Sequence, residues 1–364
     1  MKVKEITQSL EQLAPLAYAE DFDNVGLLVG DHEQEVSGVL VSLDCLEATV
    51  VEAIEKNCNL IVAFHPIIFG GLKSLTGKSY VERVVIKGIQ NDIAIYAIHT
   101  ALDNCFKGVN DMICQQLNLT NRQVLIPQSN TIKKLTTYVP KKDADKILEA
   151  LFKAGAGDIG NYENCSFSLE GKGSFLPNEK ANPVVGRKGE LQIEEEKQLH
   201  VTFSKHVEHQ VLAALKASHP YEEVAYELTS LENTNQHIGI GMLGELESGM
   251  EEKTFLKHIK EVFKTGAVRH SQVLGKKIKK VAVLGGSGAF AIEAAKAAGA
   301  DVFITADLKY HDFFKAENEI LLADVGHYES EQYTKNLLHS YLTKKFPNFA
   351  IVLAQKNTNP IQYS

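Results

Sequence analysis

Four separated residues of metal-binding types could meet at one centre: His65, Asp103, His327 and Glu331. His327 and Glu331 lie four positions apart, so on a helix their side chains point the same way, one turn apart. Imidazole and carboxylate ligands together suit zinc, manganese or iron, and a water bound to such a metal becomes a usable nucleophile. The pair fits equally well a solvated helix face with a weak i,i+4 contact.

Several acidic and imidazole side chains fall at or just past the ends of predicted strands. These positions are Asp44, His65, His99, Asp307 and His327. In an open parallel sheet, ligands gather outside the carboxyl ends of the strands, so the convergence of these positions predicts a site there. A single histidine at a strand end is usually only a polar boundary residue, and the prediction therefore depends on the whole set.

Four further residues are candidates for a supporting role around the ligands or for contact with a substrate: His99, Asp44, Asp307 and His311. Each could hydrogen-bond a metal ligand, because such ligands are usually oriented by a second polar group. Each could instead be an ordinary polar residue of the surface.

A glycine-rich segment, Gly285-Gly286-Ser287-Gly288, follows a predicted strand and precedes a helix-favouring, alanine-rich stretch. Glycines at such a place permit close approach of a phosphate to a helix N-terminus. No Gly-Lys-Ser/Thr follows, so the segment is not a P-loop, and the dinucleotide-binding fingerprint is incomplete. A tight strand-to-helix turn without a ligand explains it equally well.

The elements that must position these residues alternate between strands and helices in the first and last thirds of the chain. Near-continuous apolar strands are predicted at 38–44, 59–64, 93–98, 280–284, 301–305 and 320–325. Repetition of strand and helix with such strands predicts a mainly parallel sheet covered on both faces. Helices are also expected at 311–318 and from His327 to about Lys344, with a short edge strand at 351–353.

The middle third follows a different order. Its patterns predict β-α-β-β-α-β between about residues 130 and 235, with a loop or hairpin tip at 176–197. That order matches a ferredoxin-like unit. We therefore predict a discontinuous α/β domain, residues 1–129 and 236–364, with an inserted α+β domain at 130–235.

The composition is that of an ordinary globular protein. The 364 residues are 44% hydrophobic and 23% charged, enough for a sizeable core. The net charge of -8 does not favour binding of nucleic acid. No apolar run reaches ~18 residues and the N-terminus lacks the apolar core of a signal peptide, so we expect a cytoplasmic protein without a membrane span. The five cysteines include no Cys-x-x-Cys, which argues against disulfides or a thiolate zinc site.

With these motifs in view, the chain closely resembles the NGG-interacting-factor-three-like family, whose bacterial members are often named GTP cyclohydrolase 1 type 2 homologues. The resemblance covers essentially the whole chain. It rests on six ordered stretches: 22–27, 65–69, 99–103, 108–110, 285–288 and 326–331. Longer members carry an insert that resembles the PII/CutA-like α+β fold, which fits residues 130–235.

The resemblance implies a dinuclear divalent-metal centre, with one or two zinc, iron or manganese ions per chain, and a toroidal homohexamer. It makes His65, Asp103, His327 and Glu331 the expected ligands, with Glu331 bridging two metals. The chain departs from the family pattern at Phe64, where the first of two consecutive histidines usually stands, and at Ala101, which replaces an asparagine. Because phenylalanine cannot bind a metal, one position loses a ligand and would be weaker, empty, or completed by water or His99.

Two hypotheses about function follow. The leading one is a metal-dependent hydrolase in which Glu331 assists proton transfer and the 285–288 segment holds a phosphate of a nucleotide; opening of a purine ring and phosphoester hydrolysis both fit. The alternative is a non-catalytic metal-binding regulatory or assembly protein with the insert as a ligand sensor, which the missing histidine favours. Binding of nucleic acid through a toroid is a third interpretation, and the acidic charge argues against it.

Overall fold

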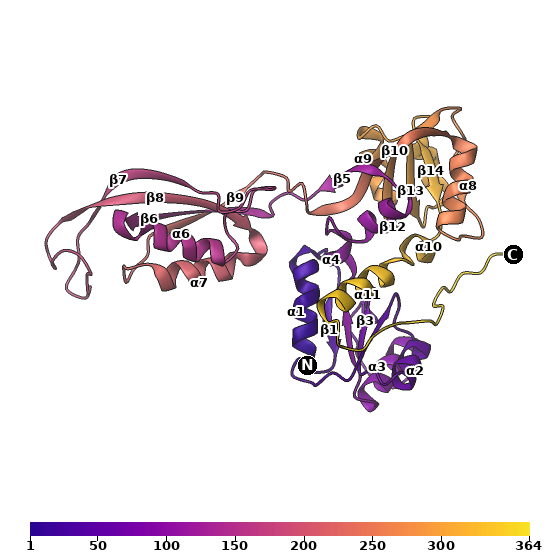
Figure 1. The fold of residues 1–364 in the computed structure, drawn as a ribbon, viewed down its shortest axis with the longest axis horizontal. Helices are drawn as coiled ribbons and strands as arrows, with labels where there is room; N and C mark the ends of the chain where they lie inside the picture. Colours follow the sequence, from indigo (N-terminus) through magenta and orange to yellow (C-terminus); the bar gives the residue numbers. More distant parts are fainter. The chain divides into compact units, whose positions relative to one another are not determined.

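The computed structural model describes residues 1–364, which divide into two compact units (Figure 1). Unit 1 comprises Met1–Pro127 and Gln236–Ser364, and unit 2 comprises Gln128–Asn235. No helix in either unit combines the length and the apolar character needed to cross a bilayer. The protein is a mixed α/β structure with three sheets.

The first sheet of unit 1 is mainly parallel and has the strand order β1-β4-β3-β2-β15. Its strands are β1 Gly26–Val29, β4 Ala94–Ala97, β3 Leu60–Ala63, β2 Val39–Ser42 and β15 Ile351–Leu353. Every residue of β2, β3 and β4 is buried, because helices cover both faces. Residues of α2 (Glu47–Glu55) and α3 (Tyr80–Gln90) pack in one core cluster, and residues of α1 (Val3–Leu13) and α11 (Thr334–Lys345) pack in another. The predicted parallel sheet and the edge strand at 351–353 are confirmed here.

The second sheet of unit 1 is mixed, in the order β11-β14-β13-β12-β10-β5. Its strands are β11 Arg269–His270, β14 Leu321–Asp324, β13 Val302–Ala306, β12 Lys277–Ser287, β10 Gly239–Glu251 and β5 Thr120–Pro127. Only β12, β13 and β14 run parallel; the other pairs are antiparallel. The prediction of a single mainly parallel sheet is therefore wrong for this half. Helices α5 (Val109–Gln116), α8 (Glu252–Val262) and α9 (Ile292–Ala297) pack against it.

Three local predictions differ from the structure. The helix expected from His327 onward is two helices, α10 (His327–Glu331) and α11, separated by Gln332 and Tyr333. The helix expected at 311–318 is a 3-10 helix, η5 (Tyr310–Ala316). The strand expected to end at Leu284 continues to Ser287, because Ser287 still pairs with Ala306 of β13.

Unit 2 is inserted between two neighbouring strands of the second sheet. β5 ends at Pro127, β10 begins at Gly239, and these two residues are register partners. The chain therefore leaves the sheet and returns to it at the same place.

Unit 2 is a four-stranded antiparallel sheet in the order β7-β8-β6-β9, with two helices. Along the chain the elements are β6 Ile132–Pro140, α6 Ala144–Lys153, β7 Phe167–Phe175, β8 Gln192–Ser204, α7 Glu208–Ser218 and β9 Tyr226–Leu231. One sheet face packs on both helices through apolar side chains such as Leu135, Leu199, Ile147 and Val211. This is the β-α-β-β-α-β order of a ferredoxin-like unit.

Candidate metal centre

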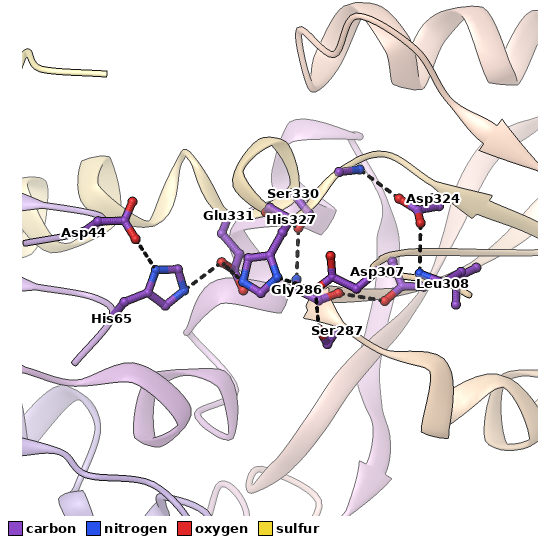
Figure 2. A network of polar contacts seen from close by, with 12 residues as sticks. Asp44, His65, Gly286, Ser287, Asp307, Leu308, Asp324, His327, Ser330 and Glu331 are labelled. Atoms are coloured by element: carbon purple, nitrogen blue, oxygen red, sulfur yellow. Dashed lines mark hydrogen bonds and ion pairs between the residues drawn. The ribbon is translucent and has the colours of Figure 1, made fainter. Parts of the chain in front are cut away.

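His65, His327 and Glu331 each bring one potential ligand atom to within 4.8 Å of the others. His65 Nε2 lies 3.1 Å from Glu331 Oε2, and His327 Nε2 lies 3.2 Å from the same oxygen (Figure 2). His65 follows β3 of the first sheet, whereas His327 and Glu331 belong to α10, which follows β14 of the second sheet. The group is therefore assembled from both halves of unit 1.

The turn between β14 and α10 orients His327 and Glu331. Gly326 adopts a positive φ of 95°, and a Cβ atom there would lie 2.2 Å from Glu329 Oε2, so only glycine fits. Its amide donates to Asp324 Oδ1 (3.1 Å), which holds the end of the strand. The helix that begins at once places His327 and Glu331 on one face, as their spacing predicts.

Each imidazole is held from behind by a separate carboxylate. His65 Nδ1 donates to Asp44 Oδ1 (2.8 Å), and His327 Nδ1 donates to Asp307 Oδ2 (2.7 Å). A carboxylate bound to one ring nitrogen fixes the tautomer that leaves the other nitrogen free for a metal. Asp44 and Asp307, both proposed from the sequence as supporting residues, thus contact the two histidines directly.

The cluster also shifts the proton affinities of its members. Burial lowers the pKa of His65, but the carboxylates of Glu331 and Asp44 outweigh it and raise that pKa to about 10. Burial likewise opposes charge on His327, whereas Asp307 and Glu331 raise its pKa to about 11. Against its own burial, Glu331 has a lowered pKa because both imidazoles stabilise its negative charge. When no cation is bound, protons on the imidazoles of His65 and His327 therefore balance the negative charge of the surrounding carboxylates.

Asp103 lies near this group but outside the set of three. It ends the short helix α4 (His99–Asp103), its side chain is buried, and its Oδ1 has no hydrogen-bond partner. Burial and the negative charge of Glu331 raise its pKa well above the usual range. His65 Nε2 and Glu331 Oε2 are also buried without a partner of hydrogen-bond geometry, despite their close approach. Buried polar atoms left unpaired are costly, so this nitrogen and oxygen donor set fits a divalent cation.

His99 stands beside the ligand group and is held by Asp23. Its Nδ1 donates to Asp23 Oδ1 (2.9 Å), and its ring centroid lies 5.3 Å from that of His65. Burial raises the pKa of Asp23, but hydrogen bonds from His99 and Thr100 outweigh it and hold that pKa at about 2. Sequence reasoning did not select Asp23, because it lies in a loop without periodicity; its only signal was the 22–27 motif.

Phe64 fills the space next to both imidazoles. It is fully buried, and its ring centroid lies 4.9 Å from that of His65 and 5.4 Å from that of His99. The residue that replaces the expected first histidine is thus part of the wall of the site.

The glycines of the 285–288 segment leave room for the side chain of Glu331. The amides of Gly285 and Gly286 donate to Asn110 Oδ1 (3.1 Å) and Ser330 Oγ (2.9 Å), so neither is free for a phosphate. A Cβ atom on Gly286 would lie 2.4 Å from Glu331 Oε1. Asn110 of α5 and Ser330 of α10, which lie in the 108–110 and 326–331 stretches but were not proposed as site residues, therefore fix the end of β12 against these two helices.

The structure does not bring His311 to the ligand group. It is exposed on η5, and its ring packs against Tyr310 and Phe314. Ser287, by contrast, donates a short hydrogen bond from its hydroxyl to Asp307, the partner of His327.

Comparison with known proteins finds relatives that match almost the whole length of this chain. A profile of the Duf34/NIF3 (NGG1p interacting factor 3) family matches residues 1–360. The chain is 40% identical to a GTP cyclohydrolase 1 type 2 homolog of Bacillus subtilis, covering 99% of this chain and 98% of that one. A homologue of the same name from Staphylococcus epidermidis is 35% identical and covers both chains completely.

Solved structures agree with the sequence comparison. A Bacillus cereus protein related to NIF3 superposes with a TM-score of 0.88 at 36% identity, over 100% of this chain and 99% of that one. Staphylococcus aureus protein SA1388 superposes with a TM-score of 0.80 at 32% identity, with the same coverage. The fold, the ordered motifs and the full-length matches agree, and the chain belongs to the Duf34/NIF3 family.

Proposed function

We propose that this protein binds a divalent cation at His65, His327 and Glu331 and is a hydrolase acting on a nucleotide or a phosphoester. One observation carries the proposal: two imidazoles direct Nε2 at a single buried carboxylate oxygen while separate carboxylates hold each Nδ1. A cation bound there would lower the pKa of a coordinated water and polarise a substrate oxygen. The names of the relatives, GTP cyclohydrolase 1 type 2 homologs, support a nucleotide substrate.

The remaining residues of the site have roles that follow from their contacts. Asp44 and Asp307 orient the two histidines, and Asp103 supplies a further buried carboxylate beside Glu331. Oε2 of the buried Glu331 faces both imidazoles, so with a cation bound at Oε2 its other oxygen, Oε1, would assist proton transfer from a coordinated water. Phe64 excludes water from one side of the site.

Metal content and turnover test this proposal together. Purified protein loaded with Zn²⁺, Mn²⁺ or Fe²⁺ is analysed by elemental mass spectrometry and assayed with GTP and with p-nitrophenyl phosphate. We expect bound metal and turnover in the wild type, loss of both in His65→Ala and Glu331→Ala, and no change in His311→Ala, which alters an exposed histidine away from the ligands. Wild-type protein that binds metal but hydrolyses neither compound would contradict the hydrolase part.

A second candidate is a metal-binding regulatory protein whose insert, PII/CutA-like by the resemblance, binds a small ligand. The observation that favours it is a cavity of about 740 Å³ within unit 2, lined by β7, the loop that follows it and residues Tyr221–Glu223. Glu196 lies on its wall, buried, with Tyr221 Oη donating to its Oε1 (3.0 Å) and no cationic side chain paired with it. Saturable binding of a small molecule, abolished in Glu196→Gln, without turnover at the metal centre would support this candidate.

We also propose a homo-oligomer, a toroidal hexamer, on the strength of family membership alone. Sedimentation velocity at several protein concentrations tests it, and a monomer at every concentration would contradict it.

A further inference from the structure

The C-terminal segment, residues 354–364, follows β15 and is tied to the first sheet. Ala354 N donates to Val41 O (2.8 Å), which extends the pairing of β15 with β2 by one residue. The amides of Gln355 and Lys356 then donate to the two carboxylate oxygens of Glu52 (2.9 and 3.1 Å). Glu52 is buried on α2, so the start of the segment has a fixed anchor.

Beyond Lys356, the segment contacts Asp44, the carboxylate that holds His65. The Thr358 hydroxyl donates to Asp44 Oδ2, while the other oxygen of Asp44 accepts from His65 Nδ1 (2.8 Å). With both oxygens engaged, the carboxylate of Asp44 cannot rotate without breaking one contact. The orientation of the His65 imidazole thus depends on the hydroxyl of Thr358, which is 293 residues further along the chain.

The next residue, Asn359, contacts α10, the helix that carries His327 and Glu331. Asn359 Nδ2 donates to Glu329 Oε1 (3.0 Å), and Glu329 is a buried residue of α10 between His327 and Glu331. The backbone amide of Asn359 also donates to Asn357 Oδ1 (3.0 Å), which fixes the turn around Thr358. Further along, the Tyr363 ring lies against Gly266, where a Cβ atom would come within 2.5 Å of it.

The two contacts therefore join the halves of the cation site. His65 depends on the first sheet, and His327 and Glu331 depend on a helix that follows the second sheet. Ligand atoms must be held within ~0.5 Å of the productive geometry for tight binding. Because the segment hydrogen-bonds to Asp44 at one end and to Glu329 at the other, it restrains the distance between His65 and the pair His327 and Glu331.

We propose that Thr358 and Asn359 are positioning residues that hold the two halves of the cation site at the distance needed for binding. This inference rests on the proposed cation binding at His65, His327 and Glu331. Neither residue touches the cation; each acts through the group that it contacts.

The test measures Zn²⁺ and Mn²⁺ affinity of the full-length protein by isothermal titration calorimetry. Thr358→Val keeps the branched shape but removes the donor, Thr358→Ser keeps the donor, and Asn359→Leu removes the amide. Gln362→Ala, an exposed position of the same segment, is the matched control. We expect about three- to tenfold weaker binding in Thr358→Val and in Asn359→Leu, below the 10–100-fold typical for a direct partner of a ligand. Thr358→Ser and Gln362→Ala should bind like the wild type.

A second readout separates positioning from general stability. Histidine ¹⁵N NMR should show a mixture of His65 tautomers in cation-free Thr358→Val at high pH and a single tautomer in Thr358→Ser, with thermal unfolding temperatures unchanged among the variants. Wild-type affinity in both Thr358→Val and Asn359→Leu would overturn this inference while leaving the proposed cation site intact. Wild-type protein that binds neither cation would instead remove the proposed function, and this inference with it.

Discussion

His65 and His327 approach each other from different sheets, with ring centroids 5.5 Å apart and both Nε2 atoms within 3.2 Å of one oxygen of Glu331. Two half-buried imidazoles packed in this way on a buried carboxylate are costly unless charge compensates them. Protons supply that compensation in the cation-free protein, and a divalent cation would replace them.

Cation binding should release protons and strengthen as the pH rises. The pKa values of His65 and His327 are raised to about 10 and about 11, so both rings carry protons near neutral pH and must lose one from Nε2 to bind a metal. We expect Zn²⁺ affinity to increase throughout the range from about pH 6 to about pH 9. Calorimetry in buffers of different ionisation enthalpy measures the released protons; a binding heat that is independent of the buffer would contradict this prediction.

Removal of the carboxylates behind the histidines should weaken binding without unfolding the protein. In Asp44→Asn and Asp307→Asn the amide group can face the imidazole with its NH₂, which no longer selects the tautomer needed at Nε2. We expect a roughly 10–100-fold loss of Zn²⁺ affinity in each. Asp21→Asn, an exposed aspartate in unit 1, is the control for the change in charge, and an equal loss there would show that charge alone is responsible.

Gly286→Ala should disrupt the site more than its backbone conformation explains. Gly286 has φ +67°, and its new Cβ would lie 2.4 Å from Glu331 Oε1. Gly275 has nearly the same φ, +71°, but open space around it, so Gly275→Ala isolates the conformational cost of about 1 kcal/mol. Urea unfolding and Zn²⁺ titration of both variants should show lost affinity only in Gly286→Ala. Equal stability and equal affinity would mean that Glu331 adapts without cost.

Unit 2 should lose stability as the pH falls below about 6.5. Burial lowers the pKa of His219, whose Nδ1 accepts from the Tyr221 amide (3.1 Å) while Nε2 donates to Tyr138 O (3.0 Å). Because the folded pKa lies below the unfolded one, the unfolded chain takes up the proton first, and stability declines from the unfolded pKa down to the folded one. Hydrogen exchange of α6 and α7, in EDTA, should show a weaker pH dependence in His219→Asn than in the wild type. His209→Asn, on the exposed side of α7, should retain the wild-type slope.

The buried parallel strands could be predicted from the sequence because their side chains are apolar on both faces. Strands β2, β3, β4, β12, β13 and β14 were all expected near their observed places. The antiparallel strands β5 and β10 were missed, since glycines and charged residues interrupt their patterns and their burial depends on distant partners. The extension of β12 through Gly286 was missed for the same reason: a glycine run resembles a turn until the neighbouring strand β13 pairs with it.

The expectation that acidic and imidazole residues converge at strand ends did not pair them; the structure places Asp44 beside His65 and Asp307 beside His327. It could not find Thr358 or Asn359, because each reaches the site through a hydrogen bond to a residue far away in the sequence. The sequence also offered His311 as a supporting residue or a substrate contact, but it lies on an exposed 3-10 helix. Only the packing of the helices, which the sequence patterns do not specify, separates these cases.

The pairing of Pro127 with Gly239 means that the insertion of unit 2 occupies the tip of a β-hairpin. The two strands that flank it are already neighbours, so a short turn could connect them without moving either strand. Hairpin tips tolerate inserted domains for this reason, because the insertion leaves the pairing of the two strands unchanged. Unit 2 therefore stands at a place in the chain where a domain could be gained or lost without any change in the strand order of unit 1.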